Sequence, residues 1–231
     1  MTRVLVVEDD PQLLRALVIN LRVRHYGVEA APDGAAALRL VAARQPDVVL
    51  LDLGLPDTDG VDIIRSLRSR GRGGSRMSIL VMSARQGSGE KVAALDAGAD
   101  DHLTKPFRME ELLAGLRAAV RRTENAPLSP GAALVETADL RIDLLAKRVV
   151  RAGRDVRLTP TEWHLLEILV TSPGRPVTRK HLLQEVWGGS QGNRTYHLRV
   201  HMARLRRELE TDPSHPRHLI TEPGTGYRFE G

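Results

Sequence analysis

Six side chains suited to phosphoryl chemistry follow four predicted strands in this 231-residue sequence. They are Glu8, Asp9 and Asp10 after 4–7, Asp52 after 48–51, Ser83 after 79–82, and Lys105 after 101–104. The segment 48–51 is a continuous apolar run, which is typical of a strand buried on both faces of a parallel sheet. The carboxyl ends of parallel strands meet at one edge of the sheet, so we expect the six side chains to gather there.

Carboxylates that gather at low dielectric repel one another and need a cation between them. Oxygen ligands favour Mg²⁺, and Lys105 would add a fixed positive charge. The set predicts phosphoryl transfer to the Asp52 carboxylate, with Mg²⁺ and Lys105 neutralising the phosphoryl oxygens and the Ser83 hydroxyl donating to them. Taken singly, Asp52 is equally a strand-end cap, Lys105 a surface lysine and Ser83 a turn residue. Their joint spacing is what favours a common site.

Predicted helices alternate with the predicted strands throughout residues 1–122. The strands are expected at 4–7, 28–31, 48–52, 79–82 and 101–104, and the helices at 11–21, 33–43, 61–68, 91–97 and 110–122. Five such repeats indicate βα units and a parallel sheet, and right-handed crossovers make that sheet open. Residues 1–122 are therefore predicted to form an α/β domain with a doubly wound, flavodoxin-like sheet of five parallel strands.

Composition narrows the class of protein. The chain has no Cys, which excludes disulfides and thiolate metal sites, and no apolar run approaches the roughly 18 residues of a membrane span. We expect a soluble cytoplasmic protein without membrane insertion. The net charge is +5, and most of the excess of Lys and Arg lies in the second half. This suggests a polyanionic partner for that half, although a solvated basic face would have the same charge.

A polar segment with two Pro and one Gly, 123–132, is typical of a linker and precedes a second predicted domain, 133–231. Short alternating runs predict an antiparallel sheet with strands at 140–144, 149–151 and 156–158. Thr159, Pro160 and Glu162 predict a capped helix start, Thr178 caps a second helix, and a third helix spans 195–210. A hairpin over 218–229 would complete an α+β winged helix-turn-helix.

The third helix of this domain is the predicted DNA-contacting element. Leu198, Met202, Leu205 and Leu209 form an apolar stripe, and the segment 194–207 contains no acidic residue. A solvated surface helix would mix charges of both signs, whereas Arg can contact guanine and Val a thymine methyl in the major groove. The predicted contacts are Arg194, Thr195, Arg199, Val200, Ala203, Arg204 and Arg207 on the helix, and Thr225 and Arg228 on the hairpin.

Both halves of the chain resemble known families. Residues 1–122 resemble the receiver domain of two-component response regulators on Val6-Val7-Glu8-Asp9-Asp10, on Leu51-Asp52-Leu53-Gly54-Leu55-Pro56-Asp57, on Ser83-Ala84 and on 98–107. Residues 133–230 resemble the effector domain of the OmpR/PhoB subfamily on Thr159-Pro160-Thr161-Glu162, Val186-Trp187 and 224–229. Two stretches, 51–57 and 195–200, are most similar to regulators of that subfamily associated with potassium-transport operons.

The resemblance implies a role for each matching residue. Asp52 would accept a phosphoryl group from a partner histidine kinase. Asp9 and Asp52 would ligate Mg²⁺ directly, Glu8 through water, and Gly54 through its backbone carbonyl. Activation would form a homodimer through the fourth helix, fifth strand and fifth helix, where the matching residues are Lys91, Asp100, Asp101, Glu111 and Arg122. The dimer would bind tandem half-sites in promoter DNA, with RNA polymerase as a further partner.

Two positions depart from the family pattern. His102 stands where receivers carry Tyr or Phe as the switch side chain, and an imidazole would make the switch weaker or pH-sensitive. Gly115 stands where the last helix usually carries an Arg that pairs with an acid at the Asp101 position across the dimer. The predicted dimer would therefore be loosened.

These departures keep a second interpretation open, in which the receiver only dimerises and the protein binds DNA without phosphorylation. A third interpretation is a phosphatase with an Asp nucleophile. It is disfavoured because that family needs a second Asp where Gly54 stands. We expect a DNA-binding transcriptional response regulator and not an enzyme.

Overall fold

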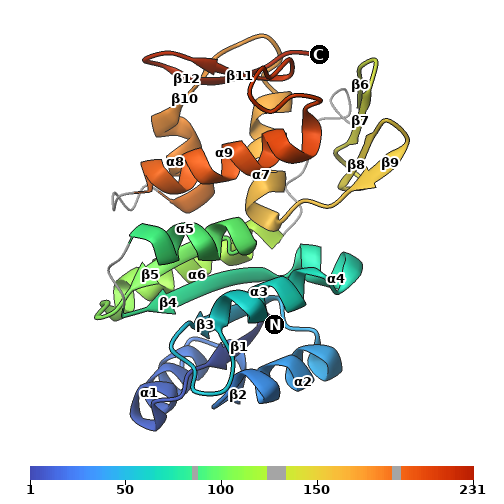
Figure 1. Cartoon of the computed structure of the whole chain (residues 1–231). Helices are drawn as coiled ribbons and strands as arrows, with labels where there is room; N and C mark the ends of the chain where they lie inside the picture. The colour runs from blue at the N-terminus through green and yellow to red at the C-terminus, as the bar shows by residue number, and fades with distance from the viewer. Residues whose placement is uncertain (85–87, 124–133, 189–193) are drawn as a thin grey trace. The chain divides into compact units, whose positions relative to one another are not determined.

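The computed structural model describes residues 1–84, 88–123, 134–188 and 194–231. The chain forms two compact units, Met1–Thr123 and Glu124–Gly231 (Figure 1). Each unit has a hydrophobic core of its own. The predicted linker, 123–132, lies outside the described residues except for Thr123. Among the helices that the structure describes, none has the length and apolar character to cross a membrane.

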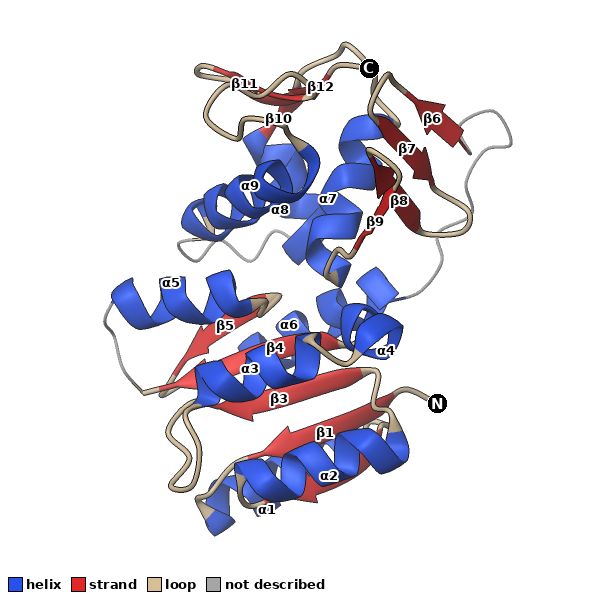
Figure 2. Ribbon diagram, turned by 45° about the vertical axis from the view of Figure 1, so that its right-hand side comes forward, coloured by secondary structure: helices blue, strands red, loops and turns tan. Residues whose placement is uncertain are grey.

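Five parallel strands form the sheet of the first unit, in the order β2-β1-β3-β4-β5. The strands are β1 (Arg3–Val7), β2 (Gly27–Ala31), β3 (Val48–Asp52), β4 (Ser78–Ser83) and β5 (Asp101–Thr104). The helices are α1 (Pro11–Arg22), α2 (Gly34–Arg44), α3 (Gly60–Arg68), α4 (Gly71–Arg76), α5 (Ser88–Ala97) and α6 (Met109–Thr123). α1 and α6 pack on one face of the sheet, and α2, α3 and α5 cover the other (Figure 2), which confirms the predicted doubly wound α/β fold.

The register of the strands aligns their carboxyl ends. Val7 of β1 pairs with Leu51 of β3, and Asp52 pairs with Met82 of β4. Ser83 pairs in turn with Thr104, the last residue of β5. All of β3 is buried because it lies between two neighbouring strands with helices on both faces. The strand ends that carry the predicted site therefore reach the same edge of the sheet.

The sequence prediction missed α4, and its local composition explains why. The segment 71–76 contains three Gly, which disfavour a helix. The half-buried guanidinium of Arg68 donates to the carbonyls of Gly74 and Met77, near the end of this helix, and to Gly98 O at 2.8 Å. It also bonds Asp100 Oδ2 at 2.6 Å. Tertiary contacts thus support a helix that the local sequence does not favour.

The second unit begins with a four-stranded antiparallel sheet and ends with a three-stranded one. The first sheet contains β6 (Leu134–Glu136), β7 (Leu140–Asp143), β8 (Arg148–Arg151) and β9 (Arg154–Val156); the second contains β10 (Val177–Thr178), β12 (Gly226–Phe229) and β11 (Leu219–Glu222). The helices are α7 (Pro160–Val170), α8 (Arg179–Trp187) and α9 (Thr195–Leu209). β6 and β10 were not predicted, because two or three residues show too little alternation. The predicted strand at 156–158 is wrong in position, since β9 ends at Val156.

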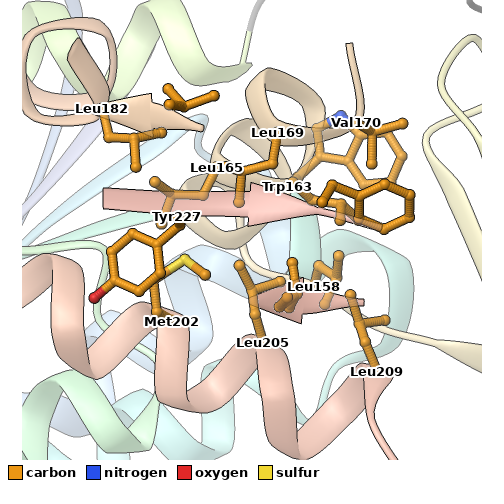
Figure 3. Close-up of a cluster of buried hydrophobic side chains, with 14 of the residues drawn as sticks. Leu158, Trp163, Leu165, Leu169, Val170, Leu182, Met202, Leu205, Leu209 and Tyr227 are labelled. Carbon is orange, nitrogen blue, oxygen red and sulfur yellow. The ribbon is translucent and has the colours of Figure 1, made fainter. Parts of the chain in front are cut away.

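Side chains from the three helices α7, α8 and α9, from the first sheet and from the β11–β12 hairpin form the core of this unit, part of which is shown in Figure 3. Met202, Leu205 and Leu209 of α9 lie opposite Leu165 and Leu169 of α7 in this core. Together with Leu198, the apolar stripe of α9 is at most 1% exposed, so its predicted core position is confirmed. The hairpin and the three helices have the architecture of a winged helix.

Polar contacts set the ends of the helices. The Thr159 side chain accepts a hydrogen bond from Glu162 N, and Glu162 Oε2 accepts one from Thr159 N at 2.9 Å, which confirms the predicted capping box of α7. Glu210, at the end of α9, is 2% exposed. Its carboxylate accepts from the backbone N–H groups of Arg217, His218 and Leu219 at 2.9, 2.9 and 2.7 Å. This carboxylate fixes the path of the chain from α9 into β11.

Candidate functional site

Three carboxylates meet at the carboxyl edge of the parallel sheet. Glu8 and Asp9 directly follow β1, and Asp52 ends β3; one oxygen of each lies within 4.8 Å of the others. Lys105, which follows β5, places Nζ 2.7 Å from Glu8 Oε2 and 2.7 Å from Asp52 Oδ2. The Asp10 carboxylate is engaged elsewhere, because it caps α1 by accepting from the N–H groups of residues 12 and 13.

The electrostatics of this cluster reflect burial and crowding. Burial raises the pKa of the Glu8 carboxyl above its usual value; the hydrogen bond from Lys105 opposes this, and the charge of Asp52 adds to it. Burial opposes the charged form of Lys105, but its hydrogen bonds to Asp52 and Glu8 outweigh this and raise its pKa. The ammonium group of Lys105 therefore remains protonated at neutral pH and joins two carboxylates.

The donor set fits a hard divalent cation. Three carboxylates from two strand ends offer only oxygen ligands, as Mg²⁺ prefers, and Asp9 is exposed to solvent, from which waters can complete the coordination. Gly54, the fourth predicted ligand residue, lies directly beside the cluster, since its N–H donates to Asp52 Oδ1 at 3.1 Å. The chemistry of these residues matches a magnesium site whose ligands would be Glu8, Asp9, Asp52 and the Gly54 carbonyl.

The two predicted switch side chains lie on neighbouring strands. Ser83 ends β4 and is 2% exposed, and its hydroxyl donates to Glu90 Oε2 at 2.9 Å. His102 is buried on β5, where it pairs in register with Val81. Ser83 is thus at the predicted edge, while its proton points to an α5 carboxylate that the sequence prediction did not include.

The predicted dimer-interface residues divide into two groups. Lys91 of α5 is half-buried and Glu111 of α6 is exposed, whereas Asp100, Asp101 and Arg122 are buried. Asp100 Oδ2 accepts from Arg68 at 2.6 Å and from Ile79 N at 2.9 Å, and its place in a dimer interface stays a prediction. Asp101 Oδ1 accepts from the backbone N–H of residue 102 at 2.9 Å.

Gly115 of α6 faces the sheet. A Cβ atom at this position would lie 3.4 Å from Leu80 Cδ2 and 3.9 Å from Asp101 Oδ2. These are ordinary van der Waals distances, so a Cβ atom at this position would contact β4 and lie near the Asp101 carboxylate of β5 without a clash.

One stripe of predicted DNA contacts on α9 is accessible. Arg199, Ala203 and Arg207 are exposed at intervals of four residues, and Thr195, one turn earlier, is half-buried. Val200, by contrast, is buried, at 9% exposed, although it does not belong to the core cluster of the unit. The hairpin turn adds an exposed Thr225.

Three predicted DNA-contacting arginines are bonded to other groups of the domain, and their contact with DNA stays a prediction. Arg194 precedes the first turn of α9, is 7% exposed and donates to Trp187 O at 3.3 Å. Arg204 pairs with Glu162 of the α7 capping box. Arg228 pairs with two acids of the wing, at positions 222 and 230. A helical projection gives the direction of each side chain but not the acids that other elements bring beside it.

Comparison with known proteins identifies the family. Residues 4–117 match the response regulator receiver domain, and residues 153–229 match the C-terminal domain of transcriptional regulatory proteins. The transcriptional regulatory protein KdpE of Mycobacterium tuberculosis is 54% identical over 100% of both chains. The chain belongs to the response-regulator family. It is of the OmpR/PhoB type and is a DNA-binding transcription regulator of a two-component system.

Further similarities cover both domains of this response regulator. The KDP operon transcriptional regulatory protein KdpE of Escherichia coli is 44% identical over 99% of each chain. The solved structure of a RitR mutant superposes with a TM-score of 0.78 at 25% identity over 100% of both chains. The receiver match includes Glu8, Asp52 and Lys105, and the C-terminal match includes α9 and the wing hairpin.

Two residues of this response regulator were missed by the sequence prediction. Glu90 is an acid in the first turn of the helix after Ser83, a position that could have drawn attention to it. Arg206 of α9 donates to Leu219 O and to Thr221 Oγ1, and its guanidinium carbon lies 5.9 Å from the centre of the Tyr227 ring. It ties α9 to the wing, and its only signal in the sequence is its place beside the apolar stripe.

Proposed function

We propose that a partner histidine kinase phosphorylates this regulator on Asp52, and that the phosphorylated protein dimerises and binds promoter DNA. The observation that carries the proposal is the position of Lys105 Nζ, 2.7 Å from carboxylate oxygens of both Asp52 and Glu8. A fixed cation at a nucleophilic carboxylate suits the charge of an incoming phosphoryl group. As a promoter-binding regulator the protein would act in the cytoplasm, with RNA polymerase as a further partner.

The proposed reaction is a transfer between two nucleophiles. A carboxylate oxygen of Asp52 attacks the phosphorus, the P–N bond to the kinase histidine breaks, and the bonding electron pair leaves with the imidazole. Lys105 is positioned to neutralise charge on the phosphoryl oxygens. Glu8, Asp9, Asp52 and the Gly54 carbonyl would hold Mg²⁺, which supplies further charge neutralisation when bound. Ser83 and His102 are the proposed switch side chains.

The proposed dimer surface comprises α5, β5 and α6, which are the fourth helix, fifth strand and fifth helix of the sequence prediction. Lys91 and Glu111 are the members of the predicted set that reach the surface. Phosphorylation favours this dimer only by as much as the phosphoryl group interacts better with the active state than with the inactive one.

The proposed DNA contacts are the accessible stripe of α9 and the turn of the wing. Arg199 and Arg207 would contact bases or phosphates. Ala203 lies between these two arginines on the helix, and Thr195 lies one turn before Arg199. Thr225 would reach the phosphate backbone of the DNA from the wing. Val200 remains a proposed methyl contact. The arginines at 194, 204 and 228 are less exposed than Arg199 and Arg207, and they are proposed to support these elements rather than to contact bases.

The similarity to KdpE supports the promoter of a potassium-transport operon as the proposed target. Genome-wide binding under kinase-on and kinase-off conditions tests this assignment. Enrichment elsewhere, with none at such an operon, would contradict it while leaving the phosphorylation proposal intact.

The phosphorylation proposal is tested on the full chain with a small phosphodonor and Mg²⁺. Phosphate-affinity electrophoresis should show a modified wild-type band and none for Asp52→Asn. The matched control is Asp62→Asn, an exposed acid of α3 paired with Arg65, which should be modified like the wild type. Label on Asp52→Asn would place the phosphoryl group elsewhere.

The second candidate function is DNA binding that does not depend on phosphorylation, with a receiver that only dimerises. The observation that favours it is the imidazole of His102 at the switch position on β5. Operator affinity of wild type and Asp52→Ala, each with kinase and ATP, separates the two functions, since equal affinities support this alternative. An Asp-nucleophile phosphatase is disfavoured by Gly54, and steady phosphate release from a small phosphoester would be needed to restore it.

A further inference from the structure

The hydrogen bond from Ser83 to Glu90 joins the end of β4 to the first turn of α5. Its length is 2.9 Å, Ser83 is 2% exposed, and Glu90 is half-buried. A serine hydroxyl has one hydrogen to donate. While that hydrogen is shared with the Glu90 carboxylate, it cannot be donated to a phosphoryl oxygen on Asp52.

We propose that Glu90 is an inhibitory latch of the receiver. In the unphosphorylated protein Glu90 holds the Ser83 hydroxyl, and phosphorylation of Asp52 turns that hydroxyl from Glu90 to the phosphoryl group. This inference rests on the proposed phosphorylation of Asp52. Glu90 is a positioning residue, because it acts through Ser83 and not on the phosphoryl group itself.

Charge makes the two arrangements exclusive. Both acceptors are anionic, so the hydrogen bond from Ser83 is charge-assisted in either state. A phosphoryl group on Asp52 also brings negative charge towards the Glu90 carboxylate and repels it. The balance between the two states is therefore set by the difference between two similar interactions, which suits a switch.

The structure provides space for the released carboxylate. Glu90 lies on the wall of a pocket beside the loop that follows Asp52, and residues 53–55 and Asp59 also line this pocket. Rotation of the Glu90 side chain into this pocket would separate its carboxylate from Ser83. Glu90 is adjacent on α5 to Lys91, a residue of the proposed dimer surface, so release of the latch would act directly beside that surface. The latch thus links Ser83 to that surface.

The test uses the full chain with Mg²⁺ and beryllofluoride, a phosphoryl analogue whose bound form is measured by fluorine NMR. Glu90→Ala should tighten beryllofluoride binding about tenfold, because a hydrogen bond to a charged acceptor no longer competes. Glu90→Gln should tighten it about threefold, since a neutral amide oxygen still accepts from Ser83. The matched control is Glu110→Ala, an exposed acid in the first turn of α6, which should leave the affinity unchanged.

A double-mutant cycle with Ser83 distinguishes the latch from a general effect of Glu90 on the structure of the receiver. In a Ser83→Ala background Glu90→Ala should lose most of its tightening, because no hydroxyl remains to be held and only the charge repulsion is relieved. Wild-type affinity in Glu90→Ala, or the same tightening with and without Ser83, would overturn the latch while the proposed function stands. Failure of beryllofluoride to bind the wild type, or equal binding by Asp52→Asn, would overturn the proposed function and the latch with it.

Discussion

The guanidinium of Arg204 on α9 donates a hydrogen bond to the carboxylate of Glu162, the residue that completes the capping box of α7. Glu162 is 1% exposed, so its end of this ion pair lies inside the effector domain. The proposed DNA-contacting helix is thereby tied to the start of α7. Arg199 is exposed on the same helix and offers a direct comparison.

Arg204→Ala should destabilise the effector domain by about 3 kcal/mol, because it leaves the buried Glu162 carboxylate without its cation. Arg199→Ala should change stability by less than about 0.5 kcal/mol but weaken promoter binding and reduce its salt dependence. Urea unfolding followed by tryptophan fluorescence reports on this domain, since both Trp of the chain, Trp163 and Trp187, lie in it. Equal loss of stability in the two variants would contradict the assignment.

Glu8→Gln should stabilise the receiver at neutral pH. The pKa of Glu8 is raised in the folded protein, so its contribution to stability is present below the ordinary value of 4.5 and is lost as pH rises through the folded pKa. The neutral amide of Gln removes the free-energy cost of burying a charged Glu8 carboxylate. The melting temperature in the presence of EDTA should therefore exceed that of the wild type at pH 7, and the gain should shrink below pH 4.5. A gain that is independent of pH would contradict this explanation.

Gly60→Ala should disturb the loop that follows Asp52. A Cβ atom at Gly60 would lie 2.5 Å from Leu53 Cδ2 and 2.7 Å from Leu53 Cα, so the loop must move. We expect a loss of about 1–3 kcal/mol and slower phosphorylation from a small phosphodonor. Gly89→Ala in α5 is the control, because a Cβ atom there meets nothing within 4 Å, and it should stabilise the helix by up to about 1 kcal/mol. The prediction fails if the two variants phosphorylate and unfold alike.

Glu210→Ala should destabilise the effector domain by about 3 kcal/mol, since it removes the acceptor of three backbone N–H groups after α9. Hydrogen exchange at Arg217, His218 and Leu219 should accelerate in this variant. Thr211→Ala, at the exposed next residue, is the control and should leave both quantities close to wild type. Unchanged exchange in Glu210→Ala would show that these amides have other acceptors.

Much of the Asp52 site follows from the sequence. Glu8 and Lys105 are 97 residues apart, yet their meeting could be predicted because each directly follows a strand of one parallel sheet. The apolar stripe of α9 was predictable for a similar reason, since helical periodicity decides which side of a helix is buried. In both cases a local pattern and one packing rule suffice.

The partners of the charged side chains were decided by the tertiary structure. Arg204 and Arg228 are predicted DNA contacts in the sequence, but acids from α7 and the wing hold them. Asp100 resembles an interface acid, but Arg68 pairs with it from 32 residues away. A long side chain reaches several neighbours, and which of them carries the opposite charge depends on how distant elements pack. Hydrophobic burial is set by local periodicity, whereas the pairing of charges is set only when the whole domain has folded.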